Sequence, residues 1–256
     1  MKYDVIIIGA GMAGMTAAIY AVRAGCKVLV LEKKVFGGQI INSLKVDNWP
    51  GDLGVSGADL MKKIYHQAHN FGVLFKEEEA ISVVNKEENG GFVVKTDESE
   101  YASGAIILAM GTEPRKLGEK QTKEARKRPI SYCATCDGAL YKNKPVVVVG
   151  SGNTAKYEIM YLKKIASKVY HVHHDDPLPK EAEAVFVAIG RVPETGFLNG
   201  LVDLDKDGYV VAGEDCKTSC SGVFVAGDCR TKKLRQLVTA AGDGANAATA
   251  AVQYLG

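Results

Sequence analysis

The chain has 256 residues, with 32 Lys and Arg against 30 Asp and Glu, so its formal net charge is only +2. Hydrophobic residues make up 46% of it and charged residues 24%, which is typical of globular proteins and excludes disordered and fibrous classes. No apolar stretch is as long as a membrane span, and the N-terminus predicts a buried strand, not a signal peptide. We therefore expect two modest domains, with no membrane segment and no nucleic-acid partner.

The first predicted unit is a βαβ. DVIIIG (4–9) and KVLVLE (27–32) predict strands, and residues 12–24 predict a helix that ends at Gly25. In the turn GAGMAG (9–14), three glycines allow a tight turn, close approach of a pyrophosphate and helix–strand packing. Glu32 then ends the second strand, where a carboxylate can accept hydrogen bonds from an adenosine ribose. Together these features predict a bound dinucleotide.

The next segments predict more strands. Residues 72–101 have the pattern of a meander of short strands, with ENGG (88–91) as a hairpin turn. AIILAMG (105–111) returns to the sheet. The basic stretch 115–128 shows no clear secondary-structure pattern.

A second βαβ follows. It consists of PVVVVG (145–150), a turn GSGNTA, a helix at about 156–165 and the strand KVYHVH (168–173). GVFVAGD (222–228) predicts another buried strand, and an alanine-rich helix runs from about 234 to the C-terminus.

The expected fold class is therefore α/β. A discontinuous Rossmann-like domain, 1–112 and 196–256, holds the dinucleotide, and a smaller α/β domain is inserted at 113–195.

Two of the six cysteines, Cys133 and Cys136, have C-x-x-C spacing, within CATCDG (133–138). Thiols at a helix start have depressed pKa values and can close a small ring. One C-x-x-C without a second ligand pair does not suit zinc, so we expect no metal. The pattern predicts a redox motif in a cytoplasmic protein. Cys216 and Cys220 are the alternative redox pair, but they lack a predicted helix start.

Eight short motifs occur in the order found in low-molecular-weight thioredoxin reductases, which the chain resembles over nearly its whole length. They are GAGMAG, GGQI (37–40), NWPG (48–51), CATCDG, GSGNTA, FVAIG (186–190), GVFVAGD and LRQ (234–236). The resemblance implies a flavoprotein disulfide oxidoreductase that binds FAD, forms a homodimer in the cytoplasm and reduces thioredoxin. It also implies that Cys136 faces the flavin, that Cys133 attacks the substrate disulfide and that Asp137 is the general acid and base.

The same resemblance assigns FAD contacts to the discontinuous domain. Gln39 would supply an amide to the flavin, Gly227 would admit the ribityl chain and Asp228 would accept hydrogen bonds from its hydroxyls. The helix that starts near Gln236 would direct its positive end at the ring. The expected FAD-binding residues are Gly9, Gly11, Met12, Ala13, Gly14, Glu32, Lys33, Gly37, Gly38, Gln39, Asn48, Ala109, Gly111, Gly227, Asp228, Arg235, Gln236 and Leu237.

The segment after the second βαβ is too short for a complete nicotinamide site. NADPH-dependent members of the family have an arginine-rich signature there, whereas this chain has HHDD (173–176), whose acidic pair would repel a 2′-phosphate. A further βαβ needs about 30 residues, and 177–183 supply seven. This departure resembles the ferredoxin-dependent flavin thioredoxin reductases, which receive electrons from reduced ferredoxin and do not use pyridine nucleotides.

Ferredoxin-dependent thioredoxin reduction is therefore the leading interpretation. Two alternatives stay open: an NAD(P)H-dependent thioredoxin reductase with a reduced nucleotide site, and a non-catalytic flavin-binding redox sensor. The intact CATCDG argues against the sensor.

Charge distribution suggests where an acidic ferredoxin would dock. Residues 115–180 contain fourteen Lys or Arg and six Asp or Glu, a balance of +8, so the rest of the chain carries −6. A solvated basic face is the simpler explanation. The docking candidates are Lys116, Lys120, Lys123, Arg126, Lys127 and Arg128, with Lys232, Lys233 and Arg235 as an extension.

Overall fold

The computed structural model describes residues 2–85 and 91–256, apart from the side chain of Asn153. The chain divides into two compact units, one formed by 1–112 with 193–256 and the other by 113–192. The expected inserted domain was 113–195. Most of the predicted turn at 88–91 lies outside the described residues. Within the described part of the chain, no helix has both the length and the apolar character needed to cross a membrane.

The first unit is built on a seven-stranded sheet. Its parallel part has the order β3-β2-β1-β6-β13, and β5 and β4 extend it from β6 as antiparallel strands. The strands are β1 (Lys2–Ile8), β2 (Val28–Leu31), β3 (Leu74–Lys76), β4 (Ala80–Asn85), β5 (Phe92–Thr96), β6 (Glu100–Leu108) and β13 (Val223–Val225).

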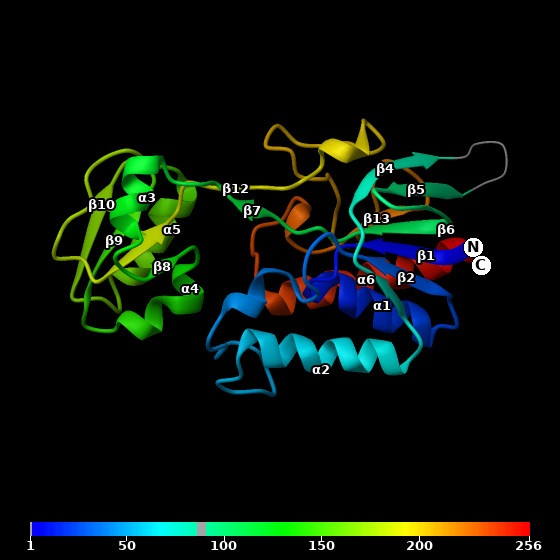
Figure 1. The fold of residues 1–256 in the computed structure, drawn as a ribbon, viewed down its shortest axis with the longest axis horizontal. Coiled ribbons are helices and arrows are strands. Elements are labelled where there is room, and N and C mark those ends of the chain that lie inside the picture. Colours follow the sequence, from blue (N-terminus) through cyan, green and yellow to red (C-terminus); the bar gives the residue numbers. More distant parts are fainter. Residues whose placement is uncertain (1, 86–90) are drawn as a thin grey trace. The chain divides into compact units, whose positions relative to one another are not determined.

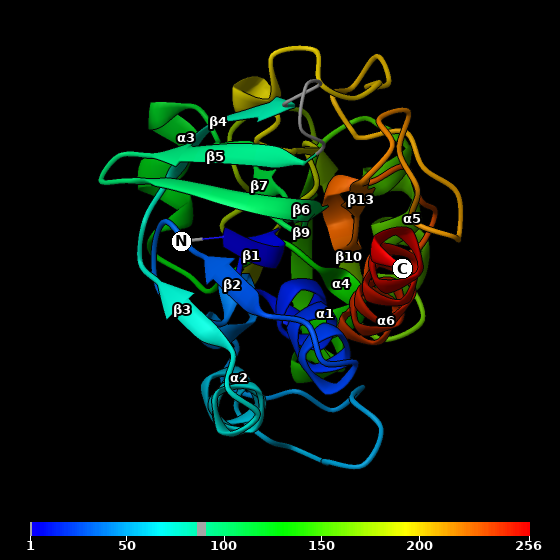
Figure 2. The same cartoon turned by 90° about the vertical axis from the view of Figure 1, so that its right-hand side faces the viewer.

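Three helices cover one face of this sheet, α1 (Met12–Arg23), α2 (Gly57–Asn70) and α6 (Leu237–Leu255) (Figure 1 and Figure 2). Successive residues of β1 point to opposite faces, so Val5 and Ile7 pack against the helices while Ile6 and Ile8 enter a second core. α6 approaches α1 closely because Gly244 has no side chain: a Cβ there would lie 2.3 Å from the Ala13 carbonyl oxygen.

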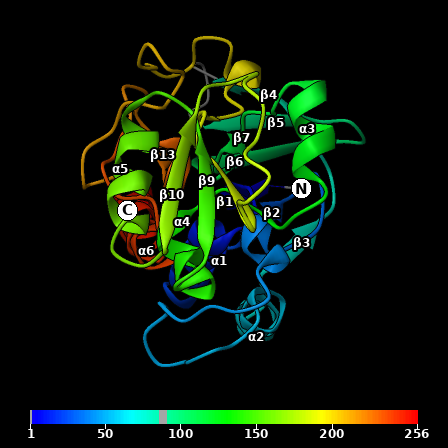
Figure 3. The same cartoon turned by 90° about the vertical axis from the view of Figure 1, so that its left-hand side faces the viewer.

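The second unit contains a sheet of four parallel strands in the order β10-β9-β11-β8. These are β8 (Ile130–Ser131), β9 (Pro145–Val149), β10 (Lys168–Val172) and β11 (Ala184–Val187). α4 (Ala134–Asp137) and α5 (Asn153–Leu162) cover one face, and α3 (Glu119–Ala125) covers the other (Figure 3). β7 (Glu113–Pro114) and β12 (Arg191–Val192) form a separate antiparallel pair.

The predicted α/β class is confirmed, and three details of the prediction were wrong. α5 begins at Asn153 instead of about 156, and α6 begins at Leu237 instead of about 234. The stretch 115–128 contains α3, although it showed no pattern. Its two buried helical positions, Gln121 and Ala125, include only one apolar residue, so the hydrophobic periodicity of α3 is weak.

Residues 173–183 form the connection from β10 to β11, here called the crossover. These two strands lie on opposite sides of β9, and Leu178 and Ala182 of the crossover pack on the face of β9 that α3 also covers. The buried Gln121 of α3 holds the first half. Its Nε2 donates to the carbonyls of His173 (3.2 Å) and Asp176 (3.0 Å).

Two further side chains hold the second half of the crossover. Glu124 Oε2 accepts a hydrogen bond from the Leu178 N–H (3.1 Å), and the Arg128 guanidinium donates to the carbonyls of Pro179 and Ala182. These bonds satisfy backbone groups of a segment that forms no helix or strand of its own. Side chains on and just after α3 therefore hold both halves of the crossover.

Replacing Arg128 with alanine should loosen the crossover. The loss of hydrogen bonds from a charged donor should lower the free energy of unfolding by about 1.5–3 kcal/mol. Urea denaturation measures this change, and amide hydrogen exchange should accelerate at 173–183. Lys127→Ala, at the adjacent exposed position, is the matched control and should stay within about 0.5 kcal/mol of the parent. Equal exchange in the two variants would show that Arg128 does not hold the crossover.

Candidate functional site

The turn between β1 and α1 has the geometry of an anion site. A Cβ at Gly14 would lie 1.9 Å from the Gly9 carbonyl oxygen, so only glycine lets the helix meet the turn. Gly11 caps the helix without a side chain, and the first turn contains no acidic residue. The backbone N–H groups of Met12 and Ala13 therefore suit a phosphate.

Glu32 lies beside this turn. Its Oε2 accepts a hydrogen bond from the Ala10 N–H (2.9 Å), and its Oε1 accepts one from the Lys34 N–H (3.0 Å). Each carboxylate oxygen has a second lone pair, so Glu32 can also accept a hydrogen bond from a ligand hydroxyl.

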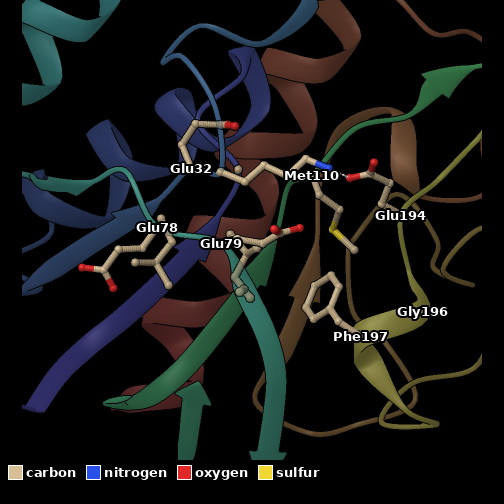
Figure 4. A pocket seen from close by; sticks show the side chains of 12 residues that line it. Glu32, Glu78, Glu79, Met110, Glu194, Gly196 and Phe197 are labelled. Carbon is tan, nitrogen blue, oxygen red and sulfur yellow. Dashed lines mark hydrogen bonds and ion pairs between the residues drawn. The ribbon is translucent and has the colours of Figure 1, made fainter. Parts of the chain in front are cut away.

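A cavity of about 250 Å³ opens at Glu32. Figure 4 shows Glu32, Glu79 and Glu194 around it, with Met110 and Phe197 as apolar lining. The expected contact residue Lys33 also lines the cavity, where its ammonium forms an ion pair with Glu194. Sequence analysis did not find Glu79 or Glu194, because neither lies in a motif. The cavity places a carboxylate-lined space next to the turn between β1 and α1.

Other expected cofactor residues are linked in pairs. Gln39, in the 3₁₀ helix η1 (Gly38–Asn42), donates to the carbonyl of Thr112. Asn48 Nδ2 donates to Gln236 Oε1 (3.0 Å), and Gln236 forms a reciprocal capping box with Thr239 at the start of α6. The other members of this set lie on the adjoining turns and helix start: Gly37, Gly38, Ala109, Gly111 and Leu237. Segments far apart in the sequence are thereby joined in one unit.

Asp228 lies in a short 3₁₀ turn, η4 (Gly227–Cys229), directly after β13. Gly227 has φ +82°, and a Cβ there would lie 2.9 Å from the Ala13 Cβ, so glycine is required beside α1. The Asp228 carbonyl accepts a hydrogen bond from Arg235 Nε (3.1 Å). The expected residues Gly227, Asp228 and Arg235 therefore lie together next to the first turn of α1.

A buried carboxylate on α6, Asp243, fixes this turn. Asp243 Oδ2 accepts from the Gly227 N–H (3.0 Å) and from Lys232 Nζ (2.6 Å), and both carboxylate oxygens accept from the Arg230 guanidinium (2.7 and 3.0 Å). Burial by itself raises the pKa of Asp243, but the hydrogen bonds from Arg230 and Lys232 lower the pKa below its ordinary value. Sequence analysis missed this cluster.

The cluster also bears on the expectation that Lys232, Lys233 and Arg235 extend the basic docking surface. The side chain of Lys232 is only 5% exposed, because it is paired with Asp243. Arg235 donates to the carbonyls of Asp228, Arg230 and Lys232 and lies over the ring of Tyr209. Lys232 is therefore not available to a docking partner, whereas Arg235 is half-buried and Lys233 is exposed, so only these two residues could extend the basic surface.

Cys133 and Cys136 form a disulfide at the start of α4, with Cys133 as the N-cap residue. Asp137, one residue further on, accepts a hydrogen bond from the buried Ser131 hydroxyl (2.7 Å), and the same hydroxyl accepts from the Cys133 N–H (3.1 Å). Ser131 thus orients both the expected nucleophile and the expected acid. The sequence carries no signal for this role beyond a serine two residues before Cys133.

The other four cysteines are thiols. Burial raises the pKa of Cys216 to about 11 and that of Cys229 to about 12, and burial also raises the pKa of Cys26 and Cys220. Protonated thiols are poor nucleophiles at neutral pH. The alternative redox pair, Cys216 and Cys220, is not bonded. The residues that the structure describes contain no group of three His, Cys, Asp or Glu arranged to hold a metal ion.

The chain matches the family model described as pyridine nucleotide-disulphide oxidoreductase in two segments, residues 3–181 and 175–244. A protein named "Thioredoxin reductase" from Listeria innocua is 36% identical over 301 aligned positions, which cover 99% of this chain and 94% of that protein. The alignment has 301 positions and this chain has only 256 residues, so at least 45 positions of the relative have no counterpart here.

Two solved structures are similar over the whole chain. Thioredoxin reductase from Streptococcus pyogenes has a TM-score of 0.89 and 31% identity, with 99% of this chain and 98% of that chain covered. A structure described as a ferredoxin-flavin thioredoxin reductase from Clostridium acetobutylicum has a TM-score of 0.64 and 28% identity, with 100% and 98% covered.

Replacing Asp243 with asparagine should destabilise the first unit by about 3–5 kcal/mol, because the buried Lys232 and Arg230 both lose its charge and Arg230 keeps only the exposed carboxylate of Glu214. The loss of stability in the variant should become smaller as the pH falls. The folded pKa of Asp243 lies below the ordinary value of 3.8, so its contribution is complete above pH 3.8 and is lost as pH falls through the folded pKa. Unfolding midpoints of parent and variant should converge in acid.

The exposed Asp207 provides the control for this measurement, and Asp207→Asn should behave like the parent at every pH. A constant difference between Asp243→Asn and the parent down to the lowest pH would contradict the assignment of the effect to the carboxylate charge.

Proposed function

The chain belongs to the pyridine nucleotide-disulphide oxidoreductases and, among them, to the thioredoxin reductase family, and from this premise we propose that it reduces thioredoxin with electrons from reduced ferredoxin. The crossover is the observation that favours ferredoxin over NAD(P)H as the electron donor, because residues 173–183 leave no room for the second half of a nicotinamide site.

The cofactor is FAD, and the residues of the first unit fit it. Nothing lies within 4 Å of the place where a Cβ on Gly11 would be, so the outer side of the turn is open to a ligand. The N–H groups of Met12 and Ala13 would hold the pyrophosphate, Glu32 a ribose hydroxyl, and Asp228 the ribityl chain. When bound, FAD supplies the conversion between single-electron donors and a two-electron disulfide couple.

The two cysteines perform the exchange with the substrate. The Cys133 thiolate attacks one sulfur of the thioredoxin disulfide, which breaks that bond, forms a mixed disulfide and releases a thiolate that takes up a proton. Cys136 then attacks Cys133, closes the Cys133–Cys136 disulfide and releases the second thioredoxin thiol. Two electrons and two protons pass to the substrate. Asp137, oriented by Ser131, is the residue that we assign to proton transfer.

Three observations support the loss of nucleotide use. The two segments matched by the family model meet at 175–181, within the crossover. At least 45 positions of the Listeria relative have no counterpart. Asp175 and Asp176 are exposed at the end of β10, where a 2′-phosphate would be repelled. NAD(P)H remains the second candidate donor, because the names of the Listeria and Streptococcus relatives mention no ferredoxin.

The exposed cations of the second unit include two groups that lie on opposite faces of its sheet. One group lies on and beside α3, and the other lies on and after α5, on the opposite face. We assign ferredoxin docking to the α3 group: Lys116, Lys120, Lys123, Arg126 and Lys127. Arg128 is left out because its guanidinium holds the crossover. Complementary charge of this kind mainly accelerates association.

Anaerobic mixing with two reductants tests the donor. NADPH should leave the flavin absorbance of the purified protein unchanged, whereas reduced ferredoxin in excess over the flavin and thioredoxin, since it supplies single electrons, should bleach the flavin and support thioredoxin reduction. Rapid bleaching by NADPH or NADH would promote the second candidate donor. A flavin that neither reductant bleaches, in a protein with a full complement of FAD, would favour a non-catalytic redox sensor.

Charge reversal tests the docking surface. The triple variant Lys120→Glu, Lys123→Glu and Lys127→Glu should slow ferredoxin-driven reduction by about tenfold or more at low salt. The matched control is Lys156→Glu, Lys163→Glu and Lys164→Glu, which changes the same charge on exposed residues of the other face. The difference should shrink at 1 M salt, where the Debye length is about 3 Å. Equal slowing of both triples would mean that only net charge matters.

A further inference from the structure

A buried acid lies against the redox centre and has no part in the steps described so far. Glu158 on α5 is 6% exposed, and its Oε1 accepts a hydrogen bond from the N–H of Ala134, the residue after Cys133 (3.4 Å). Its Oε2 is buried and has no hydrogen-bond partner among the described residues. Burying a carboxyl group without full hydrogen bonding is costly, and an apolar residue would fill the same space without that cost.

The surroundings of Glu158 favour its protonated form. The pKa of Glu158 is raised to about 7, and burial is the largest cause. The Ala134 hydrogen bond and the positive charge of Arg191 oppose this rise, and the negative charge of Asp137 adds to it. Asp137 from α4 and Arg191 from β12 are the charged groups that face it. A thiolate on Cys133 or Cys136 would add a second negative charge on the α4 side and would raise the pKa again.

We propose that Glu158 is a positioning residue that takes up one proton when the reduced Cys133–Cys136 pair ionises, and that its charge, acting beside Ala134 and Asp137, thereby sets the pH at which the nucleophilic thiolate forms. In the reduced centre, a thiol and the Glu158 carboxylate become a thiolate and a carboxylic acid, so one proton moves and the total charge stays at −1. When the thiolate is consumed by attack on a disulfide, the charge passes to the leaving thiolate. Glu158 then releases its proton, and the leaving thiolate takes one up.

This inference deepens the proposed function and rests on it for the identity of the substrate disulfide, but the proton exchange itself requires neither thioredoxin nor ferredoxin. It can therefore be tested on the intact, FAD-loaded protein alone, after anaerobic reduction with dithiothreitol and removal of the reductant. Failure of the donor or substrate assignment would leave this measurement unaffected.

The test is the alkylation rate of Cys133 by iodoacetamide between pH 5 and 9, with the modified peptide measured by mass spectrometry. In the parent, the rate should show an inflection at or above pH 7 from Glu158 as well as that of the thiol. Glu158→Gln keeps an acceptor for the Ala134 N–H but cannot ionise, so the inflection from Glu158 should disappear. Alkylation at pH 7.5–8 should rise several-fold, because no carboxylate repels the thiolate.

Glu181→Gln, at an exposed position of the same unit, is the control and should reproduce the parent profile. Superimposable profiles for Glu158→Gln and the parent would overturn the proposal. If Glu158→Gln does not fold, redox difference infrared spectra of the unaltered protein test the same proton at pH 7.5. A protonated-carboxyl band that grows on reduction and shifts with ¹³C-labelled glutamate supports the proposal, and a spectrum without such a change refutes it.

Discussion

The connection between β10 and β11 has only eleven residues, 173–183, and this length limits the secondary structure that the second unit can contain. Two parallel strands on opposite sides of a third require a connection that crosses a face of the sheet, and such a connection usually includes a helix. Here a segment without a helix crosses that face, and α3 supplies the apolar and hydrogen-bonding partners that such a helix would supply. The glycine turn before α5 begins a helix that packs in the same core as α4, which starts at the disulfide.

The first unit depends on a buried ion cluster. Asp243 is buried together with Arg230 and Lys232, and its hydrogen bond to the Gly227 N–H ties α6 to the turn that presents Asp228. Removing a carboxylate from water is unfavourable, and the two cations and the backbone donor offset that penalty. The ion cluster thus fixes the direction of a loop whose neighbours on either side, β13 and α6, are held by apolar packing.

Sequence reasoning located features that depend on local patterns. The structure places GAGMAG at the turn between β1 and α1, Glu32 beside that turn and the Cys133–Cys136 disulfide at the start of α4, while the roles of these residues stay predictions. Sequence reasoning failed for Asp243, Ser131 and Glu158, because each acts through partners brought to it by the fold. Glu158 lies in an ordinary helical stretch, and only the packing of α5 against α4 reveals that its carboxyl group is buried beside Ala134. It also failed for α3, whose buried face includes the polar Gln121.

The hydrogen bonds that hold the crossover to α3 and Arg128 affect how such a protein can change over evolutionary time. Insertion of a nucleotide-binding βαβ unit near Pro177 would separate Gln121, Glu124 and Arg128 from the backbone groups that they satisfy, and would leave buried polar groups without partners. An intermediate with the insertion but the present α3 would be less stable than either end point. Under the proposed function, regaining pyridine-nucleotide use would therefore require coordinated change in α3 and in the crossover, so that the shortened unit would form more easily than it would be lost.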